Sequence, residues 1–327
     1  MKNRRNKIFL ICIAGFITLL TVPFLGMVDI DIHSIFEKGS RGFIFWQLRL
    51  PRVILSFLAG SALALGGLVF QNIFKNSLAT PYTLGVSSGA AAGAVIAIKL
   101  NLTITIFGLN WIYISGFAGG LVSIFLILGI TRITKNYSVY TILMSGVAIN
   151  FFFSSFILLL QYMVDITQTI SVLRWLMGSI STSGYNDIFI LLPAWIFFVI
   201  IIFLVKKELL LISGGEEFAG SRGLNVKAFK IILFIIVSFI TGIIVSIVGP
   251  IGFIGLIVPH ISRLIIKNDF KVLIFFTIFL GGIILTFADM LSRLLIPPVE
   301  IPVGIITSFF GAPFFLFILI SGLRKKR

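Results

Sequence analysis

Hydrophobic residues make up 58% of the 327 residues and charged residues 11%, against about 45–50% and about 25% in globular proteins, which excludes a soluble domain. The net charge of +15 does not indicate nucleic-acid binding, because the basic residues form short clusters between apolar runs, without a stripe of stacking aromatic residues. The single cysteine, Cys12, excludes an intrachain disulfide and a thiolate metal cluster.

Ten apolar segments, bounded by charged residues, Gly, Pro or Asn, predict ten membrane-spanning helices. The expected spans cover residues 8–28, 52–70, 83–100, 109–131, 139–163, 188–205, 229–248, 252–266, 272–292 and 303–323. The first follows a basic N-terminus but lacks a small-x-small cleavage site, so we interpret it as a retained helix and not as a signal peptide. The eighth is short and follows Gly249-Pro250, which predicts a partial helix with irregular backbone.

The basic residues predict the orientation of these spans, because cytoplasmic loops carry an excess of Lys and Arg. With the N-terminus in the cytoplasm, most of the 26 Lys and Arg residues fall on the cytoplasmic side. Both ends of the chain are basic, so an odd number of spans would destroy this asymmetry. We therefore expect an even number of spans and cytoplasmic N- and C-termini.

Small residues recur at every fourth position in the second and third expected spans. They are Ser56, Gly60 and Ala64, then Gly85, Gly89 and Gly93. At 3.6 residues per turn each set forms one smooth helix face, which lets another helix backbone approach closely. We interpret both faces as packing surfaces; lining of a transport pathway is the alternative.

The sequence lacks the usual catalytic and energy-coupling motifs. No Gly-x4-Gly-Lys-Ser/Thr run is present, so the chain cannot hold ATP in a P-loop of its own. His33 and His260 fall on opposite sides of the predicted membrane, which argues against a metal or proton-relay cluster. The best candidate for an ionisable group inside a span is Asp289, four residues before Arg293 and therefore on the same helix face. A structural ion pair explains these two residues at least as well as a proton relay.

Three segments carry more information than lipid-facing helices do. Residues 46–52 place Pro51 at an expected helix start and two Arg at the interface, although an interfacial Trp and Arg anchor would look the same. Residues 213–224 have Ser and Gly at an expected cap, Glu in the first turn and Arg and Gly at the end, which predicts a short capped surface helix in the cytoplasm. Pro and Gly residues interrupt 249–260, a pattern typical of transport sites but also of packing kinks.

Motifs spread in order along nearly the whole chain resemble those of the FecCD-like permease family, the membrane subunits of type II ABC importers for iron-siderophores, haem and cobalamin. The matching stretches are LRLPR at 48–52, QNIFKNSLATP at 71–81, LGVSSGA at 84–90, WLMGS at 175–179, the helix that contains Glu216, GFIGLIVPH at 252–260, PVEIPVG at 298–304 and GAP at 311–313. The resemblance implies an all-α polytopic membrane protein with the type II ABC importer permease fold. It also implies about ten transmembrane helices in a single permease domain over 1–327.

The same resemblance implies a transport subunit of the bacterial cytoplasmic membrane that moves an iron-siderophore complex inward, without an enzymatic activity or a cofactor of its own. A second permease subunit, identical or paralogous, would complete the pathway. Two separate P-loop ATPase subunits would bind ATP, and an extracytoplasmic solute-binding protein would deliver the substrate. Haem or cobalamin is the alternative substrate, and an ion-coupled secondary transporter is the alternative class.

The resemblance also implies roles for individual residues. A coupling helix at about 213–224 would contact the ATPase through Gly215, Glu216, Glu217, Phe218, Ala219, Arg222 and Gly223. Arg49, Arg52 and Arg293 would face outward and pair with carboxylates of the solute-binding protein. The gate and pathway would include Trp175, Met177, Gly178, Gly252, Gly255 and Pro259.

Overall fold

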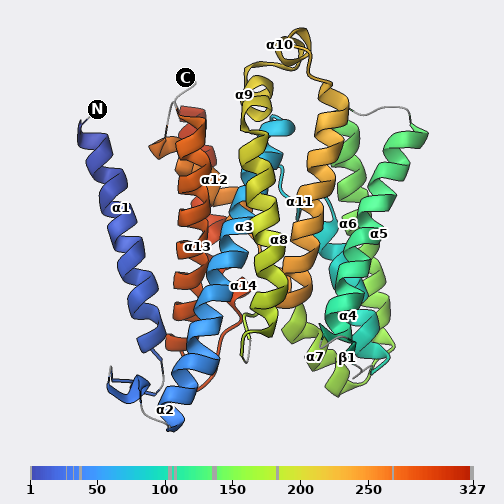
Figure 1. Ribbon diagram of the computed structural model, residues 1–327. Coiled ribbons are helices and arrows are strands. Elements are labelled where there is room, and N and C mark those ends of the chain that lie inside the picture. The colour runs from blue at the N-terminus through green and yellow to red at the C-terminus, as the bar shows by residue number, and fades with distance from the viewer. Residues whose placement is uncertain are drawn as a thin grey trace. The chain divides into compact units, whose positions relative to one another are not determined.

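The computed structural model describes residues 2–26, 28–31, 33–36, 39–101, 105–106, 109–134, 138–181, 184–266 and 269–324. Nearly all of this part of the chain is helical (Figure 1). The described strands are β1 (Thr105–Ile106) and β2 (Leu109–Asn110), which form one short antiparallel hairpin. The structure thus confirms the predicted all-α fold.

The chain forms two compact units that are interleaved along the sequence. Unit 1 comprises Met1–Leu65, Gly178–Leu192 and Ile251–Arg327, and unit 2 comprises Gly66–Met177 and Pro193–Pro250. The boundaries fall inside two helices, α3 (Leu50–Ile73) and α8 (Asn186–Leu204). Neither unit is therefore a contiguous stretch of sequence.

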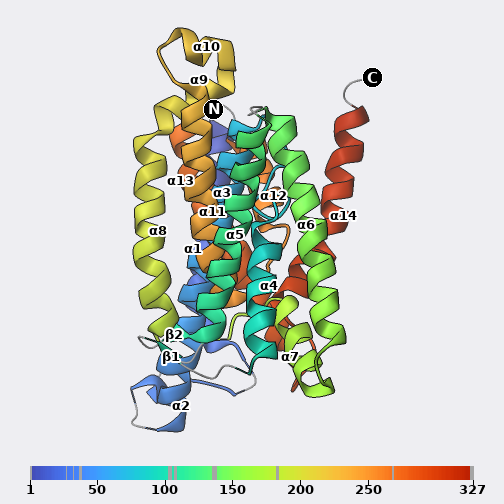
Figure 2. The ribbon, with the colours of Figure 1, turned by 90° about the vertical axis from the view of Figure 1, so that its right-hand side faces the viewer.

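Unit 1 is built from the two ends of the chain. Its helices, besides the first parts of α3 and α8, are α1 (Lys2–Thr21), η1 (Val22–Phe24), η2 (His33–Ile35), α2 (Ser40–Phe43), the π-helix η3 (Ile44–Arg49), α12 (Ile254–Ile265), α13 (Phe270–Leu294) and α14 (Val303–Arg324). Helix α1 begins and α14 ends at the same end of unit 1, and α2 lies at the opposite end (Figures 1 and 2). Which end faces the cytoplasm stays a prediction.

Unit 2 takes the middle of the chain. Its helices, besides the last parts of α3 and α8, are α4 (Val86–Lys99), α5 (Trp111–Ile133), α6 (Val139–Tyr162), α7 (Ile166–Leu176), α9 (Lys206–Gly214), α10 (Glu216–Ser221) and α11 (Val226–Val248). Helices α9 and α10 lie at one end of unit 2, and α7 and the hairpin lie at the other end (Figures 1 and 2).

Six helical stretches in the described residues are long and apolar enough to span a membrane. They are Ser40–Ile73, Trp111–Ile133, Val139–Tyr162, Asn186–Leu204, Val226–Val248 and Phe270–Leu294. Four shorter apolar helices cover Ile8–Phe24, Val86–Lys99, Ile254–Ile265 and Val303–Phe317. These stretches lie where the sequence predicts ten spans, and the ends differ by only a few residues except at the second span.

The second span shows the largest difference from the sequence prediction. Pro51 does not begin the helix, because helical backbone starts at Ser40 and continues through the π-helix η3 into α3. Proline removes one helical hydrogen bond and crowds the carbonyl four residues earlier, which here is that of Gln47. The π-helix turn accommodates this change, and the Gln47 carbonyl accepts a hydrogen bond from the Gly184 N–H at 2.7 Å.

Helices in both units approach closely where small residues face each other. In unit 1 a Cβ atom added at Gly60 would overlap the carbonyl oxygen of Gly281, and one added at Gly281 would overlap the Cβ of Ala64. In unit 2 a Cβ added at Gly89 would collide with the backbone of Gly119, and Gly93 faces the backbone of Ser115 in the same way. Backbone contact of this kind is the usual way in which helices pack tightly inside a membrane.

The remaining small residues have other roles in the structure. Gly85 is not within a helix: it precedes α4 with a left-handed φ of 79°, and its carbonyl accepts a hydrogen bond of 2.8 Å from the hydroxyl of Ser123 on α5. Ser56 is buried, and its hydroxyl donates to the carbonyl of Arg52 one turn earlier at 2.6 Å.

Candidate functional site

A cluster of charged residues joins three segments of unit 1. Arg52, near the start of α3, donates from Nε to Oδ1 of Asp289 on α13 at 2.9 Å and from Nη1 to Oε2 of Glu300, before α14, at 2.9 Å. The side chain of Arg52 is 14% exposed, that of Asp289 0% and that of Glu300 50%. Asp289 is therefore the buried anchor of the cluster, and Glu300 is the member that solvent reaches.

Asp289 also forms an ion pair with a second cation, Arg293. Nε of Arg293 lies 3.4 Å from Oδ2 of Asp289, one turn away on the same helix, which confirms the expected proximity of these two residues on one face. Arg293 is itself buried, and its Nη1 donates to the carbonyl of Leu25 at 3.4 Å. One buried carboxylate thus compensates two guanidinium groups, an arrangement in which loss of the carboxylate leaves buried charge.

Arg49 binds backbone carbonyl groups. Its guanidinium donates to the carbonyls of Pro23, at 3.4 Å, Phe24, at 2.8 Å, and Val28. These contacts hold the segment after α1 against the start of α3, and the Arg49 side chain is buried.

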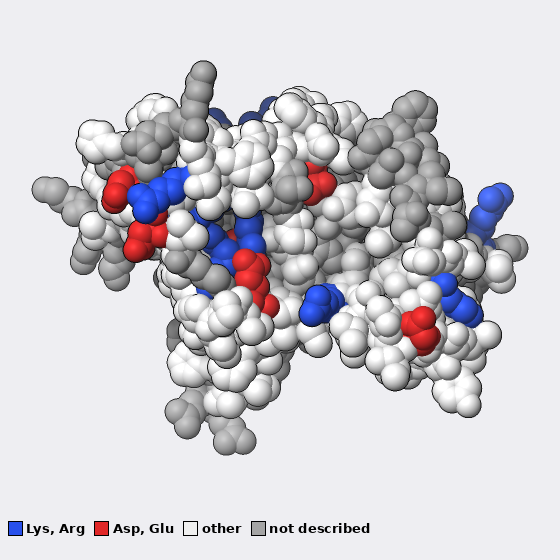
Figure 3. Space-filling view, turned by 90° about the horizontal axis from the view of Figure 1, so that it is seen from below, with Lys and Arg blue, Asp and Glu red and all other residues white. Residues whose placement is uncertain are grey.

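That Arg49 and Arg293 dock a solute-binding protein stays a prediction. Both side chains are buried and use their N–H groups within the chain. Arg52 is also largely buried, although part of its side chain is exposed beside Glu300. Figure 3 looks onto the end of the molecule that carries α2 and shows acidic side chains beside basic ones.

The expected coupling helix is α10, six residues long, at one end of unit 2. Gly215 before it has φ 147° and Gly223 after it has φ 85°, conformations that favour glycine. The Leu224 N–H donates to the carbonyl of Ala219, and the Gly223 N–H donates to that of Gly220, which together form a Schellman motif.

The start of α10 differs from the expected side-chain cap. Gly215 occupies the N-cap position and no side chain caps the helix there. The Ser213 hydroxyl donates instead to the carbonyl of Leu210 within α9, at 2.6 Å. The backbone conformation of Gly215 therefore separates α10 from α9, and of the two residue types expected at the cap the glycine occupies it.

Side chains of α10 divide into an outward and an inward set. Glu217 and Phe218 are exposed, and the guanidinium of the exposed Arg222 lies 5.3 Å from the centre of the Phe218 ring. Ala219 is fully buried. Glu216 contacts its own chain: its Oε1 lies 2.7 Å from Nζ of Lys230 on α11.

The residues expected at the gate fall in both units. Trp175 is partly buried at the end of α7, and Met177, which follows, is exposed; both belong to unit 2. Gly178 belongs to unit 1 and has a left-handed φ of 68°. Its carbonyl accepts a hydrogen bond of 3.2 Å from the N–H of Gly304 in the first turn of α14.

The predicted break in the eighth span is present. Helix α11 ends at Val248, Gly249 has φ 70°, and regular helix resumes at Ile254. Phe253 has a left-handed φ of 67°, which is strained for a bulky residue. Pro259 is buried inside α12, and Gly252 and Gly255 are partly buried.

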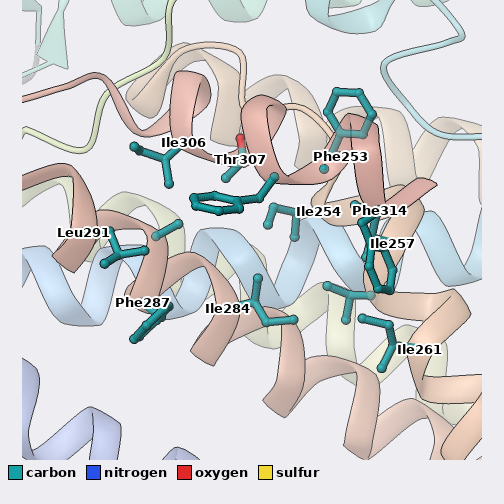
Figure 4. Close-up of a pocket in the computed structure, with 14 residues that line it drawn as sticks. Phe253, Ile254, Ile257, Ile261, Ile284, Phe287, Leu291, Ile306, Thr307 and Phe314 are labelled. Carbon is teal, nitrogen blue, oxygen red and sulfur yellow. The ribbon is translucent and has the colours of Figure 1, made fainter. Parts of the chain in front are cut away.

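A cavity of about 360 Å³ lies in unit 1 next to this break (Figure 4). Helices α12, α13 and α14 line it with apolar side chains, and Thr307 contributes a hydroxyl that donates to the carbonyl of Gly304 at 3.1 Å. Figure 4 shows Phe287 and Leu291 on one side and Phe253 and Phe314 on another. Such a lining offers neither a metal ligand nor an acid–base pair, and the described residues contain no group of His, Cys, Asp or Glu that could hold a metal.

The family described as the FecCD transport family matches residues 8–321. The chain belongs to the FecCD transport family.

Relatives from several organisms carry the same kind of name. The chain is 38% identical to the uncharacterized ABC transporter permease protein YvrB of Bacillus subtilis, over 99% of this chain and 97% of the relative. It is 36% identical to the Fe(3+)-citrate import system permease protein YfmE of the same species, over 99% and 98%. It is 37% identical to the cobalamin import system permease protein BtuC of Halobacterium salinarum, over 84% and 73%.

A solved structure, described as an inward-facing conformation of a metal-chelate type ABC transporter, has the same fold. It superposes with a TM-score of 0.86 at 26% identity and covers 97% of this chain and 99% of that chain. This FecCD protein is therefore a multi-pass transmembrane permease of an ABC importer.

Two residues of these clusters were missed by sequence reasoning. Glu300 lies in a motif that resembles the family, but its partner Arg52 is 248 residues away. Lys230 stands among apolar residues close to the start of α11, and a charge inside an apolar helix is the signal that could have drawn attention to it.

Proposed function

We propose that this permease moves an iron-siderophore complex into the bacterial cytoplasm as a single permease domain over 1–327, with both termini cytoplasmic. The observation that carries the proposal is the family match over 8–321, together with the relative named for Fe(3+)-citrate import that aligns over 99% of the chain. The relative named for cobalamin import favours cobalamin as the second candidate substrate. Haem stays the other alternative substrate.

Energy for transport would come from outside the chain. We infer that two P-loop ATPase subunits bind ATP and contact α10 through its exposed side chains, Glu217, Phe218 and Arg222. The lack of a P-loop in the sequence supports this division of labour. A short helix with fixed ends can transmit a rigid-body movement of the ATPase, whereas a flexible linker would absorb it.

A second permease subunit, identical or paralogous, would complete the pathway. The gate of this pathway would include Trp175, Met177 and Gly178. It would also include the broken segment with Gly252, Gly255 and Pro259. The strained backbone of Phe253 within that segment supports the proposal, since strained residues cluster at switch regions.

Docking of an extracytoplasmic solute-binding protein would depend most on Arg52. A carboxylate of that partner can replace the half-exposed Glu300 on Nη1 of Arg52 while Asp289 retains Nε. Arg49 and Arg293 would then shape the docking surface from beneath. Charges at the rim of an interface chiefly steer and orient the encounter.

Reconstitution in liposomes tests the proposal. The permease together with an ATPase and a solute-binding protein should accumulate radioactive iron supplied as a ferric siderophore, only when ATP is present. Uptake of cobalamin without uptake of ferric siderophore would replace the substrate. Uptake by the permease alone, driven by an ion gradient and insensitive to ATP, would establish a secondary transporter instead.

A further inference from the structure

Lys230 is a buried cation with a carboxylate partner on another helix. Its side chain is 7% exposed, and its Nζ lies 2.7 Å from Oε1 of Glu216, which is 47% exposed. A surface ion pair of two flexible, solvated side chains would contribute little. Here the ammonium group is withdrawn from water, so separation from Glu216 would leave an uncompensated buried charge.

This ion pair links α10 to α11. The backbone on either side of α10 passes through Gly215 and Gly223, at φ values of 147° and 85°. Glycine adopts these φ values without strain, and backbone hydrogen bonds close the turn at Gly223. The Glu216–Lys230 contact adds a side-chain link between α10 and α11.

Helix α11 is suited to carry a movement onward. It runs for 23 residues from Val226 to Val248. It packs on α5 nearly backbone to backbone: a Cβ added at Gly116 would lie 3.5 Å from the Cα of Ser246, and one added at Gly120 would lie 3.6 Å from the Cα of Gly242. Its end at Val248 leads directly into the irregular segment before α12.

We propose that Lys230 is a positioning residue that holds α10 on α11, so that a displacement of α10 becomes a displacement of α11. Glu216 then acts within the chain, while Glu217, Phe218 and Arg222 face the partner. The inference rests on the proposed contact of α10 with the ATPase subunits. It adds that the Glu216–Lys230 ion pair transmits a movement from this contact to α11 and so to the transport pathway.

The decisive variant is Lys230→Met, which keeps the length and apolar stem of the side chain but removes the charge. The complete complex in liposomes should still bind ATPase and hydrolyse ATP, while substrate imported per ATP hydrolysed falls about five- to tenfold, the size of a typical coupling between sites. Lys227→Met is the matched control, because Lys227 is exposed on the same helix; its ratio should equal the wild-type ratio.

Two further variants separate positioning from mere folding. Lys230→Arg retains the charge and should restore most of the coupling ratio. The exchange of Glu216→Lys with Lys230→Glu should recover part of it, although each single exchange should not. If Lys230→Met fails to fold, Glu216→Gln breaks the same pair from its half-exposed side and should lower the ratio in the same direction.

A distance measurement gives a readout that does not depend on transport. Spin labels at Ser221 on α10 and Ile235 on α11, in a Cys12→Ser background, should report one narrow distance with and without ATP, and a broadened one in Lys230→Met. A wild-type complex that binds no ATPase would overturn the proposed function. Normal ATPase binding with an unchanged coupling ratio and an unchanged distance distribution in Lys230→Met would overturn this inference alone.

Discussion

Arg52 in unit 1 and Lys230 in unit 2 are both buried cations that bind a half-exposed carboxylate, Glu300 at 2.9 Å and Glu216 at 2.7 Å. They differ in what lies behind that carboxylate. Arg52 also binds the fully buried Asp289, whereas in the described part of the chain Lys230 pairs with Glu216 alone. Because Asp289 stays bound, Arg52 can exchange Glu300 for a carboxylate of another protein. Lys230 has no such second carboxylate among the described residues, so it depends on Glu216.

Loss of Asp289 should have the largest effect in this comparison. Asp289→Asn leaves Arg52 and Arg293 without their shared buried carboxylate, and breaking a buried pair from one side costs about 3–5 kcal/mol. We expect a corresponding fall in the free energy of unfolding, seen as a lower midpoint of thermal unfolding in detergent. Asp269→Asn on the same helix is the control, because this exposed residue caps α13 and Asn caps as well as Asp. If Asp289→Asn unfolds at the same midpoint temperature as the wild type, Asp289 does not anchor the cluster.

Removal of the partner of Lys230 should have an intermediate effect. Glu216→Gln leaves the buried ammonium beside a neutral amide that can still accept its hydrogen bond, so the cost should be below the roughly 3–5 kcal/mol of a broken buried pair. The expected thermal shift, measured under the same conditions, lies between those of Asp289→Asn and Glu300→Gln. No shift would mean that Lys230 finds water or another acceptor when Glu216 is gone.

Removal of Glu300 should have the smallest effect on stability. Glu300→Gln leaves Arg52 bound to Asp289, so the cost should not exceed the value of an exposed pair, about 1 kcal/mol or less. Binding to the solute-binding protein should become tighter, since a competitor for Nη1 of Arg52 is lost. A titration of the purified permease with that protein measures the affinity. A larger destabilisation than in Glu216→Gln would contradict the comparison.

Sequence reasoning recovered the membrane-spanning helices because each is a local pattern. The expected third to tenth spans differ from the observed helices by a few residues, and the differences have local causes. Helix α11, for example, begins at Val226 and not at 229 because the Asn225 side chain accepts a hydrogen bond from the Ala228 N–H. The Asp289–Arg293 pair was predictable for the same reason, as its members lie one turn apart.

The partners of Arg52 and Lys230 could not be predicted in this way. Arg52 and Asp289 are 237 residues apart, and nothing in the local pattern around either residue selects the other. Arg49 likewise binds carbonyls that lie 26 and 25 residues earlier in the sequence, in the segment that follows α1.

Main-chain hydrogen bonds and Gly223 close the end of α10, so the shape of this turn does not depend on the chemistry of its exposed side chains. In evolutionary terms, the exposed residues of this turn can change to fit a different ATPase subunit while its backbone stays the same. These residues are Glu217, Phe218 and Arg222. A few surface substitutions can therefore adapt a permease of this kind to a new ATPase subunit, without changes in the membrane-embedded part.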